Sequence, residues 1–246
     1  MRVLITGASG GLGQEVSKLF PYAYKPTRQE MPIEESDVVR SYVEKHGPFD
    51  VLIHLAAMTG IPKCENDRQG AFAVNQVGTW NVCSRVRWNN PEAYLLYMST
   101  PCVFSGDEGQ YWEWSIPYPR NFYGFSKSMG EQVVISFGGQ YVIVRANFVP
   151  YRPFPHKYAF EDRYGTYLFA HQVASALQAI IEQRKVGTIH VVGDRILSMF
   201  DLAKLCPESQ HVLPMTLKDY TGTEHLTKNM VLESSQWPRQ PISGPK

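Results

Sequence analysis

Tyr123 and Lys127 have side chains that could move a proton, and they stand four positions apart in the sequence. On a helix this spacing places both side chains on one face, where the Lys ammonium would favour the Tyr phenolate and lower the pKa of its hydroxyl. Ser99 and Thr100 close an apolar run, residues 93–98, that we predict to be a strand. Because open α/β sheets bind ligands at the carboxyl ends of their strands, a hydroxyl there could hold a substrate carbonyl. Such Tyr and Lys pairs also occur on solvated helix faces, so this pair indicates a site only beside a cofactor.

A glycine-rich loop near the start of the chain indicates such a cofactor site. The apolar run 2–6 is followed by G-A-S-G-G-L-G at positions 7–13 and then by a helical pattern. Glycines permit a tight turn and let backbone N–H groups approach a pyrophosphate at the helix N-terminus, although a tight turn can also be purely structural. The spacing fits G-x-x-G-x-x-G or G-x-x-x-G-x-G equally well. We therefore predict a dinucleotide site, with the spacing class left open by the residues alone.

The residues after the next expected strand, 22–25, bear on which dinucleotide is accepted. An acidic residue there would bind a ribose 2′-hydroxyl and repel a 2′-phosphate. Lys25, Thr27 and Arg28 stand there instead, and an arginine can hold a phosphate in a bidentate geometry. This charge pattern favours NADPH, with NADH as the alternative. The competing interpretation is that both cations are solvated on a loop.

The composition excludes several classes of protein. The 246 residues carry 24 Lys and Arg against 23 Asp and Glu, without the dense basic run that nucleic-acid binders show. No signal-peptide pattern and no apolar run near the roughly 20 residues of a membrane span is found. The cysteines have neither disulfide-like nor metal-ligand spacing, which is typical of reduced thiols. We expect a cytoplasmic protein that binds no nucleic acid, no membrane and no metal.

Strands and helices are expected to alternate along the chain. We predict apolar strands at 49–55, 140–145 and 188–192 and helices at 37–45, 70–89 and 170–183. This order predicts an α/β fold with a doubly wound, Rossmann-like parallel sheet. A dinucleotide-binding domain is expected over residues 1–146. Most of 147–246 is expected to form a small α/β substrate lobe, interleaved with a helix and a strand of the first domain. The aromatic loop 150–160 either stacks on a ligand or packs between the lobes.

Several of these segments together resemble the extended short-chain dehydrogenase/reductase superfamily. The resemblance is carried by the Gly7 loop, Leu55-Ala56-Ala57, Val74-Asn75, Ser99-Thr100 and Tyr123-x-x-x-Lys127. It spans most of the first 145 residues, and within the superfamily the chain looks most like the dTDP-4-dehydrorhamnose reductase family. It favours the G-x-x-G-x-x-G spacing. It implies an NAD(P)H-dependent reductase of a nucleotide-linked ketosugar, as in dTDP-rhamnose biosynthesis, and is compatible with a homodimer.

The resemblance also implies roles for individual residues. Thr100 would hold the substrate carbonyl, Tyr123 would donate the proton, and Lys127 would lower the tyrosine pKa and hold the nicotinamide ribose. The expected cofactor contacts, which include Tyr123 and Lys127, are otherwise Gly7, Ser9, Gly10, Gly11, Leu12, Gly13, Arg28, Ile33, Ala56, Ala57, Met58 and Asn75. The expected substrate contacts are Thr100, Pro101, Phe148 and Asn229.

Departures from the family pattern leave two alternatives open. Pro101-Cys102 stand where the family has Asp-Tyr, Pro32 where it has an aspartate at the adenine end, and Phe148 where it has a tryptophan. Of the family's Arg-Pro-x-Asn-Ser signature, Asn229 is retained. One alternative is a non-catalytic or regulatory binding subunit, like that of methionine adenosyltransferase. The other, lesser alternative is a nucleotide-sugar epimerase. The identity of the sugar nucleotide stays open.

Overall fold

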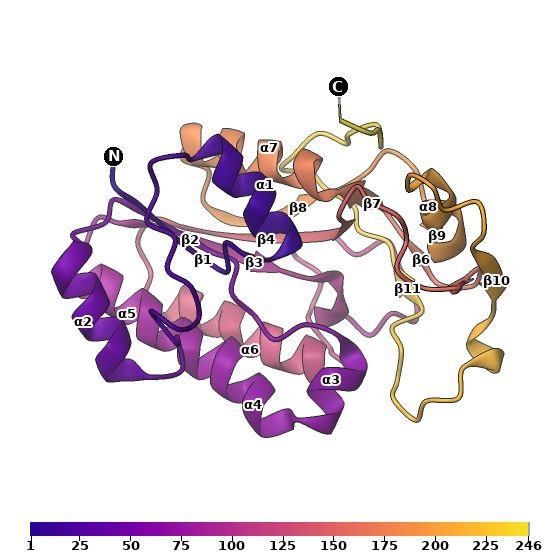
Figure 1. The fold of residues 1–246 in the computed structure, drawn as a ribbon, viewed down its shortest axis with the longest axis horizontal. Helices are drawn as coiled ribbons and strands as arrows, with labels where there is room; N and C mark the ends of the chain where they lie inside the picture. Colours follow the sequence, from indigo (N-terminus) through magenta and orange to yellow (C-terminus); the bar gives the residue numbers. More distant parts are fainter. Residues whose placement is uncertain (246) are drawn as a thin grey trace.

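A single parallel sheet forms the centre of the molecule (Figure 1). The computed structural model describes residues 1–245. The strands pair in the order β1 (Val3–Thr6), β2 (Val51–His54), β3 (Tyr94–Ser99) and β4 (Tyr141–Val149), and β4 then pairs with both β7 (Tyr167–Phe169) and β8 (Gly187–Val191). Every one of these pairings is parallel. The predicted α/β class with a Rossmann-like sheet is confirmed.

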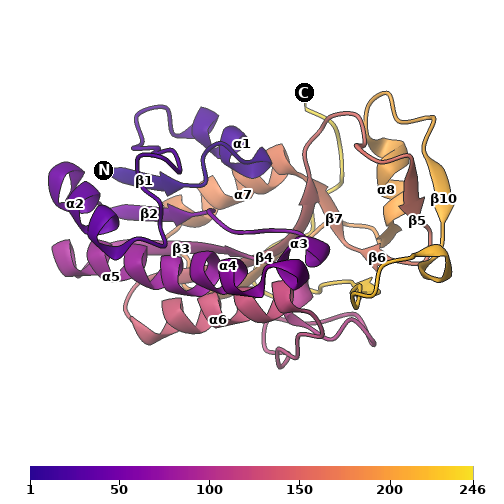
Figure 2. The same ribbon diagram turned by 60° about the horizontal axis from the view of Figure 1, so that its bottom comes forward.

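Helices cover both faces of the sheet (Figures 1 and 2). One face carries α1 (Gly11–Leu19) and α7 (Ala170–Glu182). The other carries α2 (Ser36–His46), α5 (Thr79–Asn89) and α6 (Phe122–Ser136). The helix predicted at 70–89 is composite, since α4 (Arg68–Phe72) continues through the π-helical turn η1 (Ala73–Gly78) into α5, after the short α3 (Ile61–Asn66). Within residues 1–245, no helix is both long enough and apolar enough to cross a membrane.

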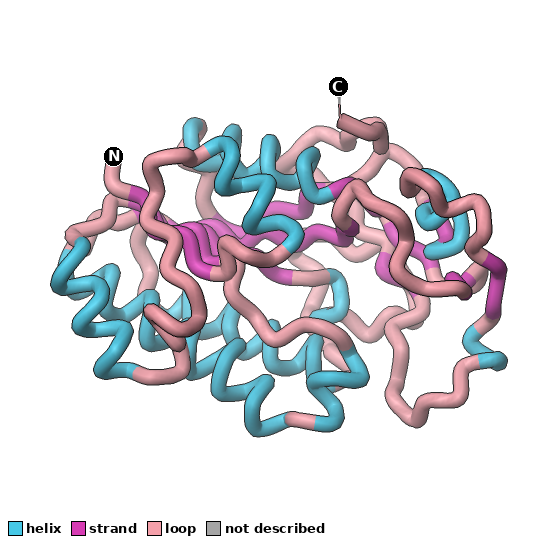
Figure 3. The backbone as a smooth tube through the Cα atoms, in the orientation of Figure 1, coloured by secondary structure: helices cyan, strands magenta, loops and turns pink. Residues whose placement is uncertain are grey.

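Alternate residues of the central strands enter two separate cores. On β3, Tyr94, Leu96 and Met98 pack in the core under α1 and α7. Leu95 and Tyr97 pack in the core under α2, α5 and α6. Successive strand side chains point to opposite faces, so a sheet covered on both faces must be apolar on both. Figure 3 shows this middle layer of strands between two layers of helices.

A smaller group of elements packs beyond the carboxyl end of β4. It contains β5 (Tyr158–Phe160) paired with β10 (Leu213–Met215), and β6 (Tyr164–Gly165) paired with β9 (Leu197–Ser198) and β11 (Asn229–Met230), together with α8 (Met199–Leu205) and the 3-10 turn η3 (Leu217–Asp219). Phe154 of the aromatic loop is buried in the core of this smaller group. Of the two roles expected for the loop, Phe154 therefore has the packing role. β4 runs through position 146 to Val149, so the strand is continuous across the expected domain boundary, and the domain division stays a prediction.

The prediction of a strand over residues 22–25 is wrong in its length, because the paired segment is shorter. Only Tyr24 pairs with β1, by an isolated parallel bridge to Leu4. The Tyr24 N–H donates to the Val3 carbonyl at 2.8 Å, and the Ile5 N–H donates to the Tyr24 carbonyl at 2.8 Å. Pro26 follows closely and has no N–H to donate, so the pairing does not continue along the sheet edge.

The turn between β1 and α1 depends on two glycines that tolerate no side chain. Gly7 has φ +73°, and a Cβ there would lie 2.6 Å from the Ala56 nitrogen. A Cβ on Gly13 would overlap the Gly7 carbonyl oxygen and lie 2.7 Å from the Ala8 backbone. The nearest atom to a Cβ on Gly10 is 3.4 Å away. The turn is therefore closely packed at Gly7 and Gly13 and open at Gly10.

We expect Gly13→Ala to lower the free energy of unfolding by about 1–3 kcal/mol, because its methyl group must displace backbone atoms. Gly10→Ala is the matched control and should cost less than about 1 kcal/mol, because Gly10 is an extended N-cap with open space beside it. Urea unfolding followed by circular dichroism measures both values. Equal losses for the two variants would show that packing of the turn does not depend on Gly13.

Candidate active site

A cavity of about 690 Å³ lies at the carboxyl ends of β1, β2, β3 and β4. The glycine turn and residues from 26 to 34 line it from one side. The smaller group of elements closes it from another side with Arg163, Met199 and Met230. This is the edge of an open parallel sheet where ligands bind, so the topology puts the cavity where the strand-end residues were expected to act.

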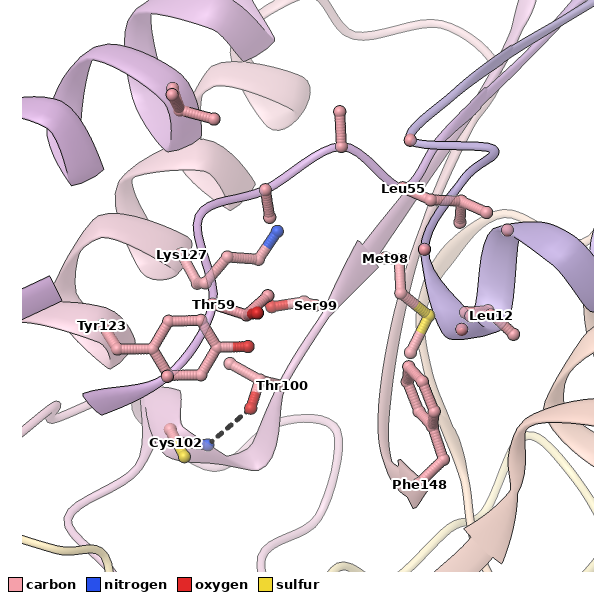
Figure 4. A pocket seen from close by; sticks show the side chains of 18 of the residues that line it. Leu12, Leu55, Thr59, Met98, Ser99, Thr100, Cys102, Tyr123, Lys127 and Phe148 are labelled. Carbon is pink, nitrogen blue, oxygen red and sulfur yellow. Dashed lines mark hydrogen bonds between the residues drawn. The ribbon is translucent and has the colours of Figure 1, made fainter. Parts of the chain in front are cut away.

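Thr100, Tyr123 and Lys127 meet in this cavity (Figure 4). Thr100 follows β3, and its hydroxyl oxygen accepts a 3.3 Å hydrogen bond from the Cys102 N–H at the start of the 3-10 turn η2 (Pro101–Val103). Tyr123 and Lys127 extend from the first turns of α6, with the Tyr123 hydroxyl directed towards Ser99 and Thr100. The spacing of four positions therefore produces the shared helix face that it predicted.

The start of α6 is held by Asn121. Its side-chain oxygen accepts from the Gly124 N–H at 2.9 Å and caps the helix. Its amide nitrogen donates to the His225 carbonyl at 3.2 Å and to the Thr227 hydroxyl at 3.1 Å. Because one side chain bonds both the helix start and the smaller group of elements, it fixes the position of Tyr123 relative to both sides of the cavity.

Burial sets the protonation of both side chains on α6. It raises the pKa of Tyr123, an effect that Cys102 reinforces and the Thr100 hydroxyl partly opposes. It lowers the pKa of Lys127 to about 7, with Glu131 acting in the opposite direction. The expected lowering of the Tyr123 pKa by Lys127 is therefore wrong in this structure, because loss of hydration raises that pKa and Lys127 is not among the groups that shift it. The Lys127 ammonium lies 4.0 Å from the centre of the Tyr97 ring. Burial thus keeps the Tyr123 phenol neutral, and the neutral phenol is the form that donates a proton.

A buried carboxylate one turn after Lys127 organises the floor of the site. Glu131 accepts from Ser99 Oγ at 2.5 Å and from Arg145 Nε and Nη2 at 2.9 and 2.7 Å. The two-pronged pairing neutralises the carboxylate in the core and ties α6 to β3 and β4. Sequence reasoning missed this pair. The available signals were a Glu four residues after Lys127 and a charged residue within the apolar strand 141–146.

The first turn of α1 forms the wall expected to receive a cofactor diphosphate. Gly10 is its N-cap and offers no side chain to bond the first N–H groups, which therefore lack a capping partner at a turn that lines the cavity. Among the expected cofactor contacts, the cavity wall contains Gly7, Ser9, Gly10, Gly11, Leu12, Gly13, Arg28, Ile33, Ala56, Ala57, Tyr123 and Lys127. Among the expected substrate contacts it contains Thr100 and Phe148.

Four expected contacts lie outside the wall: Met58, Asn75, Pro101 and Asn229. The Asn75 side chain accepts from the Met58 N–H at 2.8 Å and donates to the Met58 carbonyl at 3.0 Å and to Ser126 Oγ at 2.9 Å. It thereby fastens the loop after β2 to α6, which supports the site from behind. Pro101 is buried in η2, and its neighbour Cys102 lines the cavity instead.

Asn229 supports a loop. Its amide donates to the Glu108 carbonyl at 3.1 Å, and its side-chain oxygen accepts from the Val231 N–H at 3.2 Å. Met230, the next residue of β11, lines the cavity. Neighbouring strand residues point to opposite faces, so retention of Asn229 in the sequence did not reveal which of the two faces the cavity.

The two cations expected beside the ribose differ in position. The Lys25 ammonium donates to the Ser17 and Pro21 carbonyls at 3.3 and 3.1 Å, and Lys25 does not line the cavity. Arg28 lines it and is paired with Glu34 at 2.5 Å. Sequence reasoning missed Glu34, which follows Ile33 in the same wall. The wall is therefore less positive than a count of cations along the sequence predicted.

We expect the free energy of unfolding to rise with pH more steeply in the wild type than in Lys127→Met between about pH 7 and 9.5. The folded-state pKa of Lys127 is about 7, below its ordinary 10.5. Between these values the unfolded chain binds a proton that the folded chain does not, so raising the pH favours folding by up to about 1.4 kcal/mol per unit.

Urea unfolding at pH 7, 8 and 9 measures these slopes. Lys18→Met removes an exposed ammonium, 68% accessible at its side chain, and should give a curve parallel to that of the wild type. If the Lys127→Met curve also ran parallel to the wild type, the lowered Lys127 pKa would be wrong.

Comparison with known proteins places this geometry in a family. A family model described as the RmlD substrate binding domain matches residues 1–152. The dTDP-4-dehydrorhamnose reductase of Aggregatibacter actinomycetemcomitans is 27% identical over 230 residues, which cover 82% of this chain and 76% of the relative. Methionine adenosyltransferase 2 subunit beta of Rattus norvegicus is 26% identical over 274 residues, which cover 96% of this chain and 81% of the relative.

Solved structures agree over nearly the whole chain. The dTDP-4-dehydrorhamnose reductase of Bacillus anthracis, in complex with NADP, superposes with a TM-score of 0.88 at 25% identity, covering 98% of this chain and 95% of the other. A hypothetical dTDP-4-dehydrorhamnose reductase of Sulfolobus tokodaii superposes with a TM-score of 0.81 at 28% identity, covering 96% and 93%. The chain therefore belongs to the RmlD substrate-binding domain family, whose dTDP-4-dehydrorhamnose reductases are NAD(P)-dependent oxidoreductases, as its resemblance to extended short-chain dehydrogenases/reductases implied.

Proposed function

We propose that this protein is an NADPH-dependent reductase that acts on the ketone of a nucleotide-linked sugar. The observation that carries the proposal is that Thr100, Tyr123 and Lys127 line one cavity together with the glycine turn of α1. The dTDP-4-dehydrorhamnose reductase relatives support the substrate class. The NADP in the Bacillus anthracis structure supports the cofactor, with NADH as the alternative.

The residues present fit a dinucleotide. The uncapped N–H groups of α1 would hold its diphosphate, the small side chains of Ala56 and Ala57 would allow its nicotinamide half to pack closely, and Lys127 would bond the adjoining ribose. When bound, the cofactor supplies the hydride for the reduction.

Thr100 and Tyr123 would act on the substrate oxygen. The Thr100 oxygen accepts from the Cys102 N–H, and its own proton would be donated to the carbonyl when the substrate is bound. The protonated Tyr123 phenol would give its proton to the oxygen as negative charge develops there. The Lys127 ammonium on the same helix face would stabilise the phenolate left behind.

A non-catalytic binding subunit is the second candidate. The relatives named methionine adenosyltransferase 2 subunit beta favour it, because they match 96% of this chain. Pro101, which stiffens the backbone after Thr100, favours it as well. The nucleotide-sugar epimerase alternative has no such support, since the solved epimerases are about 18% identical and share the fold alone. Turnover separates the two remaining candidates.

Tyr123→Phe should reduce turnover about 10²- to 10⁴-fold, the range for loss of a positioned general acid, while the dissociation constant for NADPH stays within about threefold. The assay follows NADPH oxidation with dTDP-4-keto-6-deoxysugar and a panel of other nucleotide-linked ketosugars. Tyr118→Phe is the matched control, because Tyr118 is 66% exposed and lies outside the cavity wall. A wild type that binds NADPH, reduces none of these sugars and co-isolates with a stable partner chain would favour the binding subunit.

Glu34→Gln should tighten NADPH binding about three- to tenfold and leave NADH binding nearly unchanged, because it frees Arg28 from a competing carboxylate. Arg28→Gln should weaken NADPH by about 1–2 kcal/mol relative to NADH, at the low end for charge-assisted contacts because the Arg28 side chain is 71% exposed. Fluorescence titration of the wild type and both variants with each cofactor measures the six affinities. If both variants change NADPH and NADH binding equally, Arg28 does not contact the 2′-phosphate.

The homodimer and the cytoplasmic location expected from the sequence stay predictions. The adjacent helices α5 and α6 expose large apolar side chains, among them Trp80, Phe125 and Ile135.

A further inference from the structure

Arg163, immediately before β6, is a buried cation without an anion. It is 8% exposed and lines the cavity from the smaller group of elements. Its Nε donates to the Thr227 carbonyl at 3.0 Å, and its Nη1 lies 3.5 Å from the thioether sulfur of Met199. Within residues 1–245, no carboxylate lies within 4.0 Å of the guanidinium, and its Nη2 donates to no acceptor.

Arg145 shows how this protein normally buries such a group. Its guanidinium bonds both oxygens of Glu131, at 2.9 and 2.7 Å, and lies near His190. Arginine is rarely buried without a partner, because an unpaired charge loses its hydration without compensation. A thioether is only a weak acceptor. The guanidinium carbon of Arg163 lies 5.3 Å from the centre of the Phe160 ring, a cation–π contact that compensates part of the lost hydration. Arg163 still retains hydrogen-bond donor capacity that the described residues do not use.

A second hydrogen-bond donor in the same wall also has only a weak sulfur acceptor. Asn147, on β4, lines the cavity, and its amide donates to the thioether of Met230 at 3.6 Å. The amide also lies beside Gly165, two residues after Arg163 on β6, since a Cβ there would be 2.8 Å from the Asn147 nitrogen. Two donors of the cavity wall thus contact methionine sulfurs. Methionine side chains are flexible and can move aside for a stronger acceptor.

We propose that Arg163 and Asn147 bind a phosphoryl group of the nucleotide-linked substrate. The proposal rests on the proposed function for its substrate class. A phosphate supplies several oxygen acceptors and a negative charge, which is what a guanidinium fork and an amide in the same wall recognise. The turn of α1 is the site expected for the cofactor diphosphate, so the anion at Arg163 belongs to the second ligand. The sugar ketone would then lie between this anchor and Thr100.

Calorimetric titration of dTDP and of thymidine into the full-length protein saturated with NADP⁺ tests the proposal. Saturation prevents dTDP from occupying the cofactor diphosphate site. The wild type should bind dTDP more tightly than thymidine. Arg163→Met should weaken dTDP about 10- to 100-fold, as expected for loss of a charge-assisted contact, and leave thymidine and NADP⁺ affinities unchanged. Arg195→Met is the matched control, because Arg195 is 54% exposed at its side chain and lies outside the cavity wall.

Two further variants keep the test decisive if Arg163→Met fails to fold. Arg163→Lys retains the charge and should lose only part of the dTDP affinity. Asn147→Ala should fold, because the amide gives up only a sulfur contact, and should weaken dTDP several-fold. Unchanged dTDP binding in these variants, or equal losses of dTDP and thymidine, would overturn the proposal.

The outcomes also separate this proposal from the reductase function. A protein whose dTDP affinity depends on Arg163 but which reduces no ketosugar would support the phosphate site and contradict the reductase. An active reductase whose dTDP affinity does not depend on Arg163 would support the reductase function and contradict the phosphate site.

Discussion

The buried ion pair between Glu131 and Arg145 holds together the elements that form the site. Glu131 belongs to α6 and Arg145 to β4, and the same carboxylate bonds Ser99 at the end of β3. Burying two charges costs several kcal/mol for each ion, and the two-pronged geometry offsets that cost only while α6 stays in register with both strands. The pair therefore acts as a positional constraint, and Tyr123 and Lys127 occupy the helix segment that it constrains.

Burial has opposite consequences for the two side chains above this pair. It keeps the phenol of Tyr123 protonated and brings the pKa of Lys127 down to about 7. Glu131, one turn below, partly restores the ammonium. Lys127 is thus poised near neutral pH by its environment while Tyr123 stays protonated, and the Tyr to Lys spacing by itself does not determine that balance.

The two sides of the cavity offer anions different kinds of partner. The α1 side presents backbone N–H groups at a turn where Gly7 and Gly13 leave no room for side chains. The opposite side presents the side chains of Arg163 and Asn147 against methionine sulfurs. Backbone donors are rigid, whereas side chains on flexible neighbours can adapt.

Local sequence patterns determined much of the fold. Apolar runs predicted β2, β3, β4 and β8, the glycine turn predicted the start of α1, and the Tyr123 and Lys127 spacing predicted their shared face. Each depends on residues close together in the chain, where backbone geometry and side-chain periodicity suffice. The strand at 22–25 failed because its length depends on pairing at a sheet edge, which Pro26 interrupts.

The electrostatics of the site were decided by tertiary structure. Arg28 with Glu34, Glu131 with Arg145, and Arg163 with Met199 are each defined by folded contacts, and the last pair joins residues 36 positions apart in the chain. The sequence by itself determined which residues could carry charge and which segments could form strands or helices. Only the packing of those segments decided which charges were neutralised, which donors faced the cavity and which pKa values moved, because each depends on burial and on partners from other elements.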